Sequence, residues 1–136
     1  MNLDKQKIKI WLPTIIWGSV IFLFSSISNV PDQIGDLPYF DKFFHLGEFT
    51  IFGFLLFRSF KFSLKNNTNL NILLLTVVLG TFFAASDEMY QFFVPNRMPD
   101  LKDLIVDSFG CILGSHLFLN RNFIMSKFNF LKKKGG

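Results

Sequence analysis

The stretch IWLPTIIWGSVIFLFSSI, residues 10–27, carries no charged side chain and decides the class of this protein. At about 1.5 Å of rise per residue, a helix over this stretch can cross most of the hydrocarbon core of a bilayer. Three lysines precede it and small residues end it, so it also fits a secretory signal with a cleavage site. Its apolar part is longer than the core of a usual signal, which favours a first membrane span at residues 8–27.

The composition of the whole chain agrees with a membrane protein. Half of the 136 residues are hydrophobic, 20 are phenylalanine, and the mean hydropathy is +0.37. A soluble domain of this length buries only about two thirds of its unfolded surface, which is too little to hide so much apolar sequence from water. The net charge of +4 comes from short basic clusters between apolar runs, a pattern typical of contact with anionic lipid. We therefore expect membrane lipids as partners, and no nucleic acid.

Three more apolar runs follow, separated by polar segments. We expect spans at residues 41–60, 69–91 and 103–120, followed by a basic tail at 121–136. The second run is the weakest by hydropathy and also fits a re-entrant or interfacial helix. The segment before it, residues 28–40, holds two prolines and a glycine, which indicates an exposed loop. The expected fold is an all-α bundle of four transmembrane helices in a single domain over residues 1–136.

The basic residues alternate between the two ends of the expected spans. Lysines precede the first span, and both lysine and arginine occupy the turn between the second and third spans and follow the fourth. The two remaining loops carry more aspartate than basic residues. Because short cytoplasmic loops hold the excess of lysine and arginine, we expect both chain termini in the cytoplasm.

Ionisable side chains interrupt three of the apolar runs. Asp41, His45 and Glu48 share one face of the second span, because they follow an i, i+4, i+7 spacing. A carboxylate inside a bilayer costs about 2.5–3.5 kcal/mol unless it is protonated, paired or hydrated. Polar residues also lie toward the outer ends of the third and fourth spans and in the loop between them, namely Glu88, Gln91, Arg97, Asp103 and Asp107. The sequence therefore predicts one outward-facing polar pocket.

Two roles fit such a pocket. In a structural network, Arg97 and His45 neutralise carboxylates and join helices, at about 0.6 kcal/mol for each interhelical hydrogen bond. A binding or catalytic site is the favoured interpretation, because ionisable groups inside a membrane bundle usually mark function. The candidate catalytic residues are His45 as a general base, Glu48 and Glu88. The candidate substrate-binding residues are Arg97, Gln91, Asp41, Asp103 and Asp107.

The acids of this pocket outnumber its bases, so some carboxyls are expected to be protonated or to bind a divalent cation. The sequence contains no dense metal-ligand motif, and so it names no metal ligands. Outside the pocket, Gly110 and Gly114 form a stripe of small residues that favours close helix packing within the chain. Cys111 is expected to be a small packing residue.

Three motifs occur in order along the chain: D-K-x-x-H at 41–45, D-E-x-x-Q-x-x-x-P-x-R at 87–97 and D-x-x-x-[ND]-x-x-G at 103–110. As a set, over about residues 8–119, they resemble the VanZ-like family. The resemblance implies a polytopic bacterial membrane protein whose namesake is associated with resistance to the glycopeptide teicoplanin, without an established reaction. The family often has glycine where this chain has Asn96, and asparagine tolerates the left-handed backbone that a turn there needs. Asp107 adds an acid where many relatives carry asparagine.

The resemblance and the pocket together predict a multi-pass protein of the bacterial cytoplasmic membrane. We expect it to act on, or shield, a cell-envelope component, such as a lipid-linked wall precursor or a glycopeptide. The alternative is a metal-dependent hydrolase of a phosphorylated lipid at the outer leaflet. A small transporter has little support, because the sequence shows no paired discontinuous helices.

Overall fold

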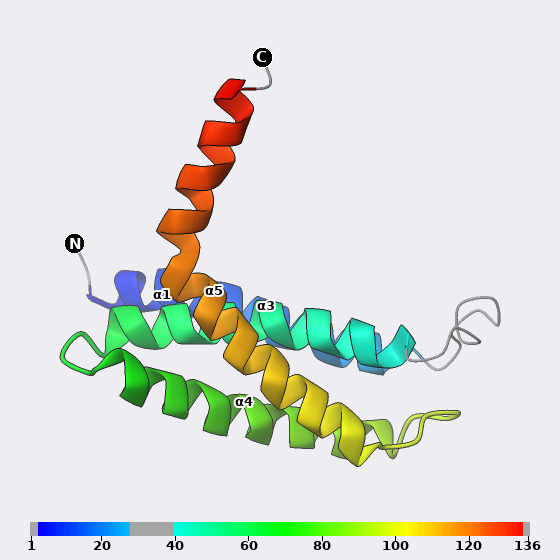
Figure 1. The fold of residues 1–136 in the computed structure, drawn as a ribbon. Helices are drawn as coiled ribbons and strands as arrows, with labels where there is room; N and C mark the ends of the chain where they lie inside the picture. Colours follow the sequence, from blue (N-terminus) through cyan, green and yellow to red (C-terminus); the bar gives the residue numbers. More distant parts are fainter. Residues whose placement is uncertain (1–2, 28–39, 135–136) are drawn as a thin grey trace.

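The computed structural model describes residues 3–27 and 40–134, which form four α-helices (Figure 1). These are α1 (Leu3–Ser25), α3 (Phe40–Ser63), α4 (Asn69–Gln91) and α5 (Leu101–Lys134). No strand occurs within the described ranges, and the all-α prediction is confirmed. Residues 28–39 of the expected exposed loop lie outside the described residues.

Three of these helices are long and apolar enough to cross a membrane: α1 over Lys5–Ser25, α3 and α4. The weak second run belongs to a continuous helix of 24 residues, which is longer than a bilayer core requires. The fourth expected span, residues 103–120, is helical throughout but is not among the three. Its apolar run is interrupted by Asp107 and bounded by Asp103 and Arg121.

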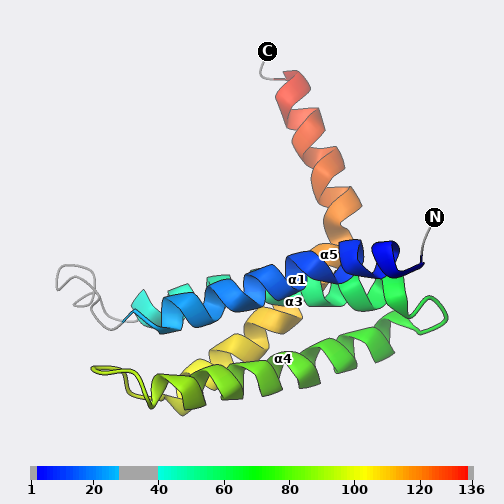
Figure 2. The ribbon, with the colours of Figure 1, turned by 180° about the vertical axis from the view of Figure 1, so that it is seen from behind.

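The helices α1, α3 and α4 run lengthwise beside one another, and α5 crosses them obliquely (Figures 1 and 2). The central element is α3, because it contacts each of the other three helices. The apolar run of α5 ends before Arg121, but the helix continues through the basic residues to Lys134. This last part of α5 leaves the bundle in both views.

Local sequence signals explain where α4 begins and ends. The Thr68 hydroxyl accepts a hydrogen bond from the backbone N–H of Asn71 at 3.2 Å, which caps the first turn. The helix ends at Gln91, four residues before Pro95, which cannot continue a helical hydrogen-bond ladder. Because the cap at Thr68 starts α4 directly after a short turn, α3 and α4 can lie antiparallel.

Phenylalanine rings and a few hydrogen bonds join the helices. Phe52 of α3 stacks on Phe83 of α4, with ring centroids 4.5 Å apart. The Trp17 indole of α1 donates a hydrogen bond to the backbone carbonyl of Glu48 at 2.9 Å. The hydroxyls of Thr14 and Ser59 lie 2.8 Å apart, which ties the middle of α1 to α3. These contacts set the depth of α1 relative to α3.

Glycines allow α3 and α5 to approach at backbone contact. A Cβ atom added to Gly114 would lie against the backbone of Thr50, and one added to Gly53 would lie against the backbone of Cys111. Cys111 is fully buried, and its sulfur atom fills the space that a side chain at Gly80 would need. The predicted close packing at the Gly110 and Gly114 stripe and the packing role of Cys111 are both confirmed.

Candidate functional site

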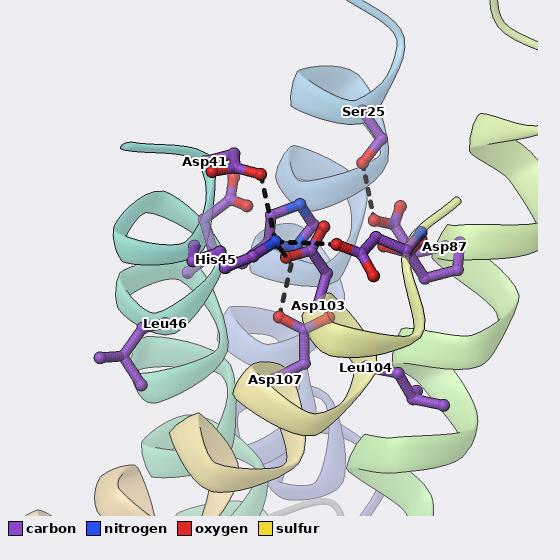
Figure 3. Close-up of polar contacts among 12 residues, drawn as sticks. Ser25, Asp41, His45, Leu46, Asp87, Asp103, Leu104 and Asp107 are labelled. Atoms are coloured by element: carbon purple, nitrogen blue, oxygen red, sulfur yellow. Dashed lines mark hydrogen bonds and ion pairs between the residues drawn. The ribbon is translucent and has the colours of Figure 1, made fainter. Parts of the chain in front are cut away.

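Polar side chains converge at the end of the bundle where α3 begins, α4 ends and α5 begins (Figure 3). Each of the three helices contributes buried ionisable groups, and α1 contributes a buried hydroxyl. The buried members are Ser25, His45, Glu48, Asp87, Glu88, Gln91, Asp103 and Asp107, which we call the polar cluster. Residues from all three sequence motifs therefore lie in one place.

His45 pairs with a carboxylate of α5. Its Nδ1 atom lies 3.2 Å from Oδ1 of Asp107, and both side chains are buried (Figure 3). No hydrogen bond joins His45 to Glu48 or Glu88 among the described side chains. Asp107 is therefore the carboxylate that orients the imidazole.

Lys42 forms the densest ion-pair group of the site. Its Nζ atom lies 2.7 Å from Asp103, 3.0 Å from Asp100 and 3.3 Å from Asp41. The Asp41 side chain is 56% exposed, so this candidate binding residue lies at the rim rather than in the cluster. The backbone N–H of Lys102, followed by the Lys42 ammonium, holds the pKa of Asp100 below its ordinary value.

Lys42 was not among the predicted site residues, although it belongs to the D-K-x-x-H motif. The sequence signal that could have identified it is its position one turn before His45, where a long side chain can reach acids of the facing helix. Its pairing with α5 depends on which helix lies opposite, which the spacing within α3 does not show.

A second group of hydrogen bonds surrounds Asp87. The Ser25 hydroxyl donates to Asp87 Oδ2 at 2.7 Å, and the Gln91 amide donates to the same oxygen at 3.2 Å. The amide of Gln91 also donates to the Ser25 hydroxyl at 3.3 Å, so its N–H groups face protein atoms. Asp87 and Ser25 were missed as site residues. Asp87 begins the second motif four residues before Gln91, whereas nothing in the sequence distinguishes Ser25 from its neighbours.

Among the described residues, Arg97 pairs with backbone carbonyls and with none of the carboxylates. Its Nε atom donates to the backbone carbonyl of Ile27 at 3.2 Å, and its Nη2 atom donates to that of Phe24 at 3.4 Å. Carbonyls at a helix C-terminus carry partial negative charge, so the guanidinium is favourably placed beside the end of α1. The preceding Asn96 has a φ of 62°, which confirms the expected left-handed backbone. Within the described residues, Arg97 forms no ion pair with a carboxylate.

Four buried carboxylate oxygens have no hydrogen-bond partner among the described residues. They are Glu48 Oε1, Asp87 Oδ1, Glu88 Oε1 and Asp107 Oδ2. The other oxygen of Glu88 accepts a hydrogen bond from the backbone N–H of Asp100 at 2.8 Å. A buried acceptor without a partner costs about 1–3 kcal/mol, and more when it is charged. The cluster therefore has unused capacity to accept hydrogen bonds or to coordinate a cation.

One subset of the cluster has the composition of a cation site. His45, Glu88 and Asp107 each offer one ligand atom, and these three atoms lie within 4.8 Å of one another. The candidate catalytic residue Glu48 is buried on the same helix as His45 but is not part of this group. One imidazole nitrogen with two carboxylate oxygens is a mixed ligand set that first-row divalent cations accept.

A mainly apolar cavity of about 390 Å³ adjoins the cluster between the end of α4 and the start of α5. This volume lies within the range of small-molecule sites. Glu88 and Asp100 are its acidic lining residues. The apolar side of the cavity is formed by Met89, Phe92, Phe93, Leu101 and Leu104. Glu88 therefore belongs both to the polar cluster and to the wall of an apolar cavity.

The VanZ/LLP1 family model matches residues 4–125 of the chain. Neither a curated protein nor a solved structure gives a significant match. The matched range contains the whole polar cluster and the apolar cavity beside it.

Proposed function

Because the chain belongs to the VanZ/LLP1 family, we propose that its polar cluster is a binding site that faces outward from the bacterial cytoplasmic membrane and acts on, or shields, a cell-envelope component. The observation that carries this proposal is the convergence of buried ionisable groups from three helices, with four carboxylate oxygens left without partners among the described residues. Ionisable groups in a membrane bundle are costly to keep, and they are usually kept for function.

A purely structural network accounts less well for this geometry. Such a network is stabilising when its buried groups are all satisfied, and a partly satisfied one is worse than an apolar core. Here Arg97, the expected neutralising residue, donates to backbone carbonyls instead of carboxylates. A bound ligand or ion that supplies the missing partners would remove this cost.

The proposal includes four spans, with α5 crossing the membrane over residues 103–120 and both chain termini in the cytoplasm. Lysines at the start of α1 lie at the same end of the bundle as Arg58 and Lys61 of α3 and as Lys65 in the turn between α3 and α4. The acid-rich cluster lies at the other end, which the positive-inside rule assigns to the outer side. Ser25 of α1 donates to Asp87, which supports α1 as a retained span rather than a cleaved signal.

This orientation predicts the outcome of cysteine labelling in cells. In a Cys111→Ser background, Met98→Cys is expected to react with a membrane-impermeant maleimide in intact cells, because the exposed Met98 lies in the outer loop. Asn67→Cys, in the turn between α3 and α4, is expected to react only after the membrane is permeabilised. Labelling of both positions in intact cells, or of Asn67→Cys alone, would contradict the outward orientation.

A lipid-linked wall precursor is the component that the site fits best. Its apolar chain would lie in the cavity beside Met89, Phe92 and Phe93, and its head group would reach the cluster at Glu88. Shielding or altering such a precursor would lower the effect of glycopeptides, including teicoplanin, that act on the same precursor. We therefore propose glycopeptide resistance as the cellular readout.

Loss of the imidazole is expected to abolish this function. In a teicoplanin-susceptible bacterial host, expression of the parent protein is expected to raise the inhibitory concentration of teicoplanin several-fold, and His45→Ala is expected to return it to the level of an empty vector. His116→Ala is the matched control, because it removes the other histidine, which is exposed and pairs with Asn120. Membrane abundance of each variant is measured in parallel. Equal protection by His45→Ala and the parent at equal abundance would refute the proposed role of the cluster.

Hydrolysis of a phosphorylated lipid, with a metal cofactor, is the second candidate function. It is favoured by the pairing of His45 with Asp107, which has the form of a general base held by a carboxylate. In this reaction His45 removes a proton from water, the hydroxide forms a bond to phosphorus, and the leaving oxygen takes a proton as its bond to phosphorus breaks. Release of inorganic phosphate from a phosphorylated lipid in nanodiscs tests this hydrolysis. Absence of turnover would refute it, and binding would remain as the proposed function.

A further inference from the structure

The three helices each place one potential metal ligand at the same point in the cluster. His45 comes from α3, Glu88 from α4 and Asp107 from α5. Their exposed fractions are 5%, 8% and 0%, so water reaches none of them freely. Ligand atoms contributed by different helices and held in a buried position are characteristic of metal sites in helical bundles.

Two of these side chains also have oxygens that nothing in the described structure satisfies. Glu88 Oε1 and Asp107 Oδ2 are buried and accept no hydrogen bond from the described residues. Two carboxylates and one imidazole in so small a space carry a formal charge of about −2 when the imidazole is neutral. A single divalent cation would balance that charge, and the carboxylates have oxygens free to bind it.

We propose that His45, Glu88 and Asp107 bind one divalent transition-metal cation of the Zn²⁺ and Mn²⁺ class. The imidazole nitrogen favours a transition metal over Mg²⁺ or Ca²⁺, which prefer ligand sets made only of oxygen. Three protein ligands also leave at least one coordination position open for a ligand or water, as in catalytic zinc sites.

The geometry allows coordination with small side-chain movements. Metal–ligand bonds of about 2.1 Å in a tetrahedral arrangement hold the ligand atoms about 3.4 Å apart. The present separations are at most 4.8 Å, so each side chain needs to move inward by only about 1 Å. The backbone N–H of Asp100 already holds the second oxygen of Glu88, which is the kind of outer contact that orients metal ligands.

This inference deepens the proposed binding function and rests on it, because the cation occupies the same cluster. A His45 that coordinates the cation cannot also be the general base of the hydrolysis, so the inference applies to the binding function. An acid-rich cluster repels anionic groups, whereas a bound cation with an open position attracts them. The substrate class that the loaded site would accept is therefore a component with a phosphate or carboxylate head group, next to the apolar cavity that Glu88 lines. The bound metal would supply to the polar cluster the positive charge that Arg97, which donates to backbone carbonyls, does not supply.

Metal binding can be measured on the full chain without any assay of resistance. The protein, without an affinity tag, is purified in detergent micelles, treated with a chelator and titrated with Zn²⁺ or Mn²⁺ alone by calorimetry, with bound metal counted by mass spectrometry. We expect one equivalent per chain. His45→Ala and Asp107→Asn are each expected to weaken binding at least 100-fold, and His116→Ala to leave it within threefold of the parent.

Two results would overturn the metal site: less than half an equivalent bound by the parent, or unchanged affinity in His45→Ala. Because a variant can fail to fold, pulsed electron paramagnetic resonance of the Mn²⁺-loaded parent provides an independent readout. It is expected to show the ¹⁴N coupling of one imidazole ligand, and its absence would also refute the assignment. Loss of resistance in His45→Ala without any metal binding would refute this inference but leave the binding proposal standing.

Discussion

Replacing Gly114 by leucine is expected to destabilise the protein by about 3 kcal/mol or more. A side chain at Gly114 would lie against the backbone of Thr50 and Phe54, which cannot rotate away as a flexible side chain can. The two helices would have to separate, and α5 would carry Asp103 and Asp107 away from Lys42 and His45. We therefore expect loss of the polar cluster together with loss of stability.

Cys111 makes this change measurable, because its thiol is fully buried and reacts only when the bundle opens. Thermal unfolding in detergent, followed by a thiol-reactive fluorophore, should show a much lower midpoint for Gly114→Leu than for the parent. Gly47→Ala is the matched control, since a Cβ atom there meets nothing within 4 Å. A midpoint for Gly114→Leu that equals that of Gly47→Ala would contradict the close contact of α3 and α5.

Replacing Lys42 by alanine is expected to cost about 2–3 kcal/mol of unfolding free energy. Removing one partner of a buried ion pair leaves an uncompensated charge and costs about 3–5 kcal/mol, and partial exposure reduces this value. The Lys42 side chain is 20% exposed and that of Asp103 is 9% exposed, so this ion pair is intermediate between a fully buried pair and a surface pair. Most of this lost unfolding free energy should come from the uncompensated charge of Asp103, since Asp100 and Asp41 remain within reach of water.

The reason for this loss can be tested by a second change. Asp103→Asn removes the unpaired charge, so the double variant Lys42→Ala with Asp103→Asn is expected to recover more than half of the lost stability. Lys102→Ala is the matched control, because its side chain is exposed and the described structure gives it no ion pair, and it should change stability by less than about 0.5 kcal/mol. No recovery in the double variant would show that Lys42 acts by packing rather than by its charge.

Much of the fold could be predicted from the sequence because membrane helices obey a simple length rule. The expected spans at 8–27, 41–60 and 69–91 each lie almost wholly within a helix of the structure, with ends that differ by a few residues. Apolar length and flanking charges define such helices without reference to their neighbours. The C-terminal end of the fourth helix could not be predicted in this way, because α5 continues past its apolar run through Arg121 and the basic residues.

The members of the polar cluster were also largely visible in the sequence. Asp41, His45 and Glu48 share a helical face, and the acids of the other helices stand out within apolar runs. A charged side chain in such a run needs a partner or a function, so its position alone marks it. Side-chain spacing within one helix does not reveal which residue of another helix it meets. Ser25 was missed for that reason, and neither Asp87 nor the neighbouring Lys42 was among the predicted site residues.

The sequence by itself determined the helical class, the apolar lengths and the set of ionisable residues at one end of the bundle, because these follow from local composition and periodicity. Only the tertiary structure decided the pairing: His45 with Asp107, Lys42 with Asp103, and Arg97 with backbone carbonyls at and just after the end of α1. The physical reason is that partner choice depends on helix rotation and depth. Those are set by contacts between distant segments, such as Gly114 against Thr50 and Trp17 against Glu48.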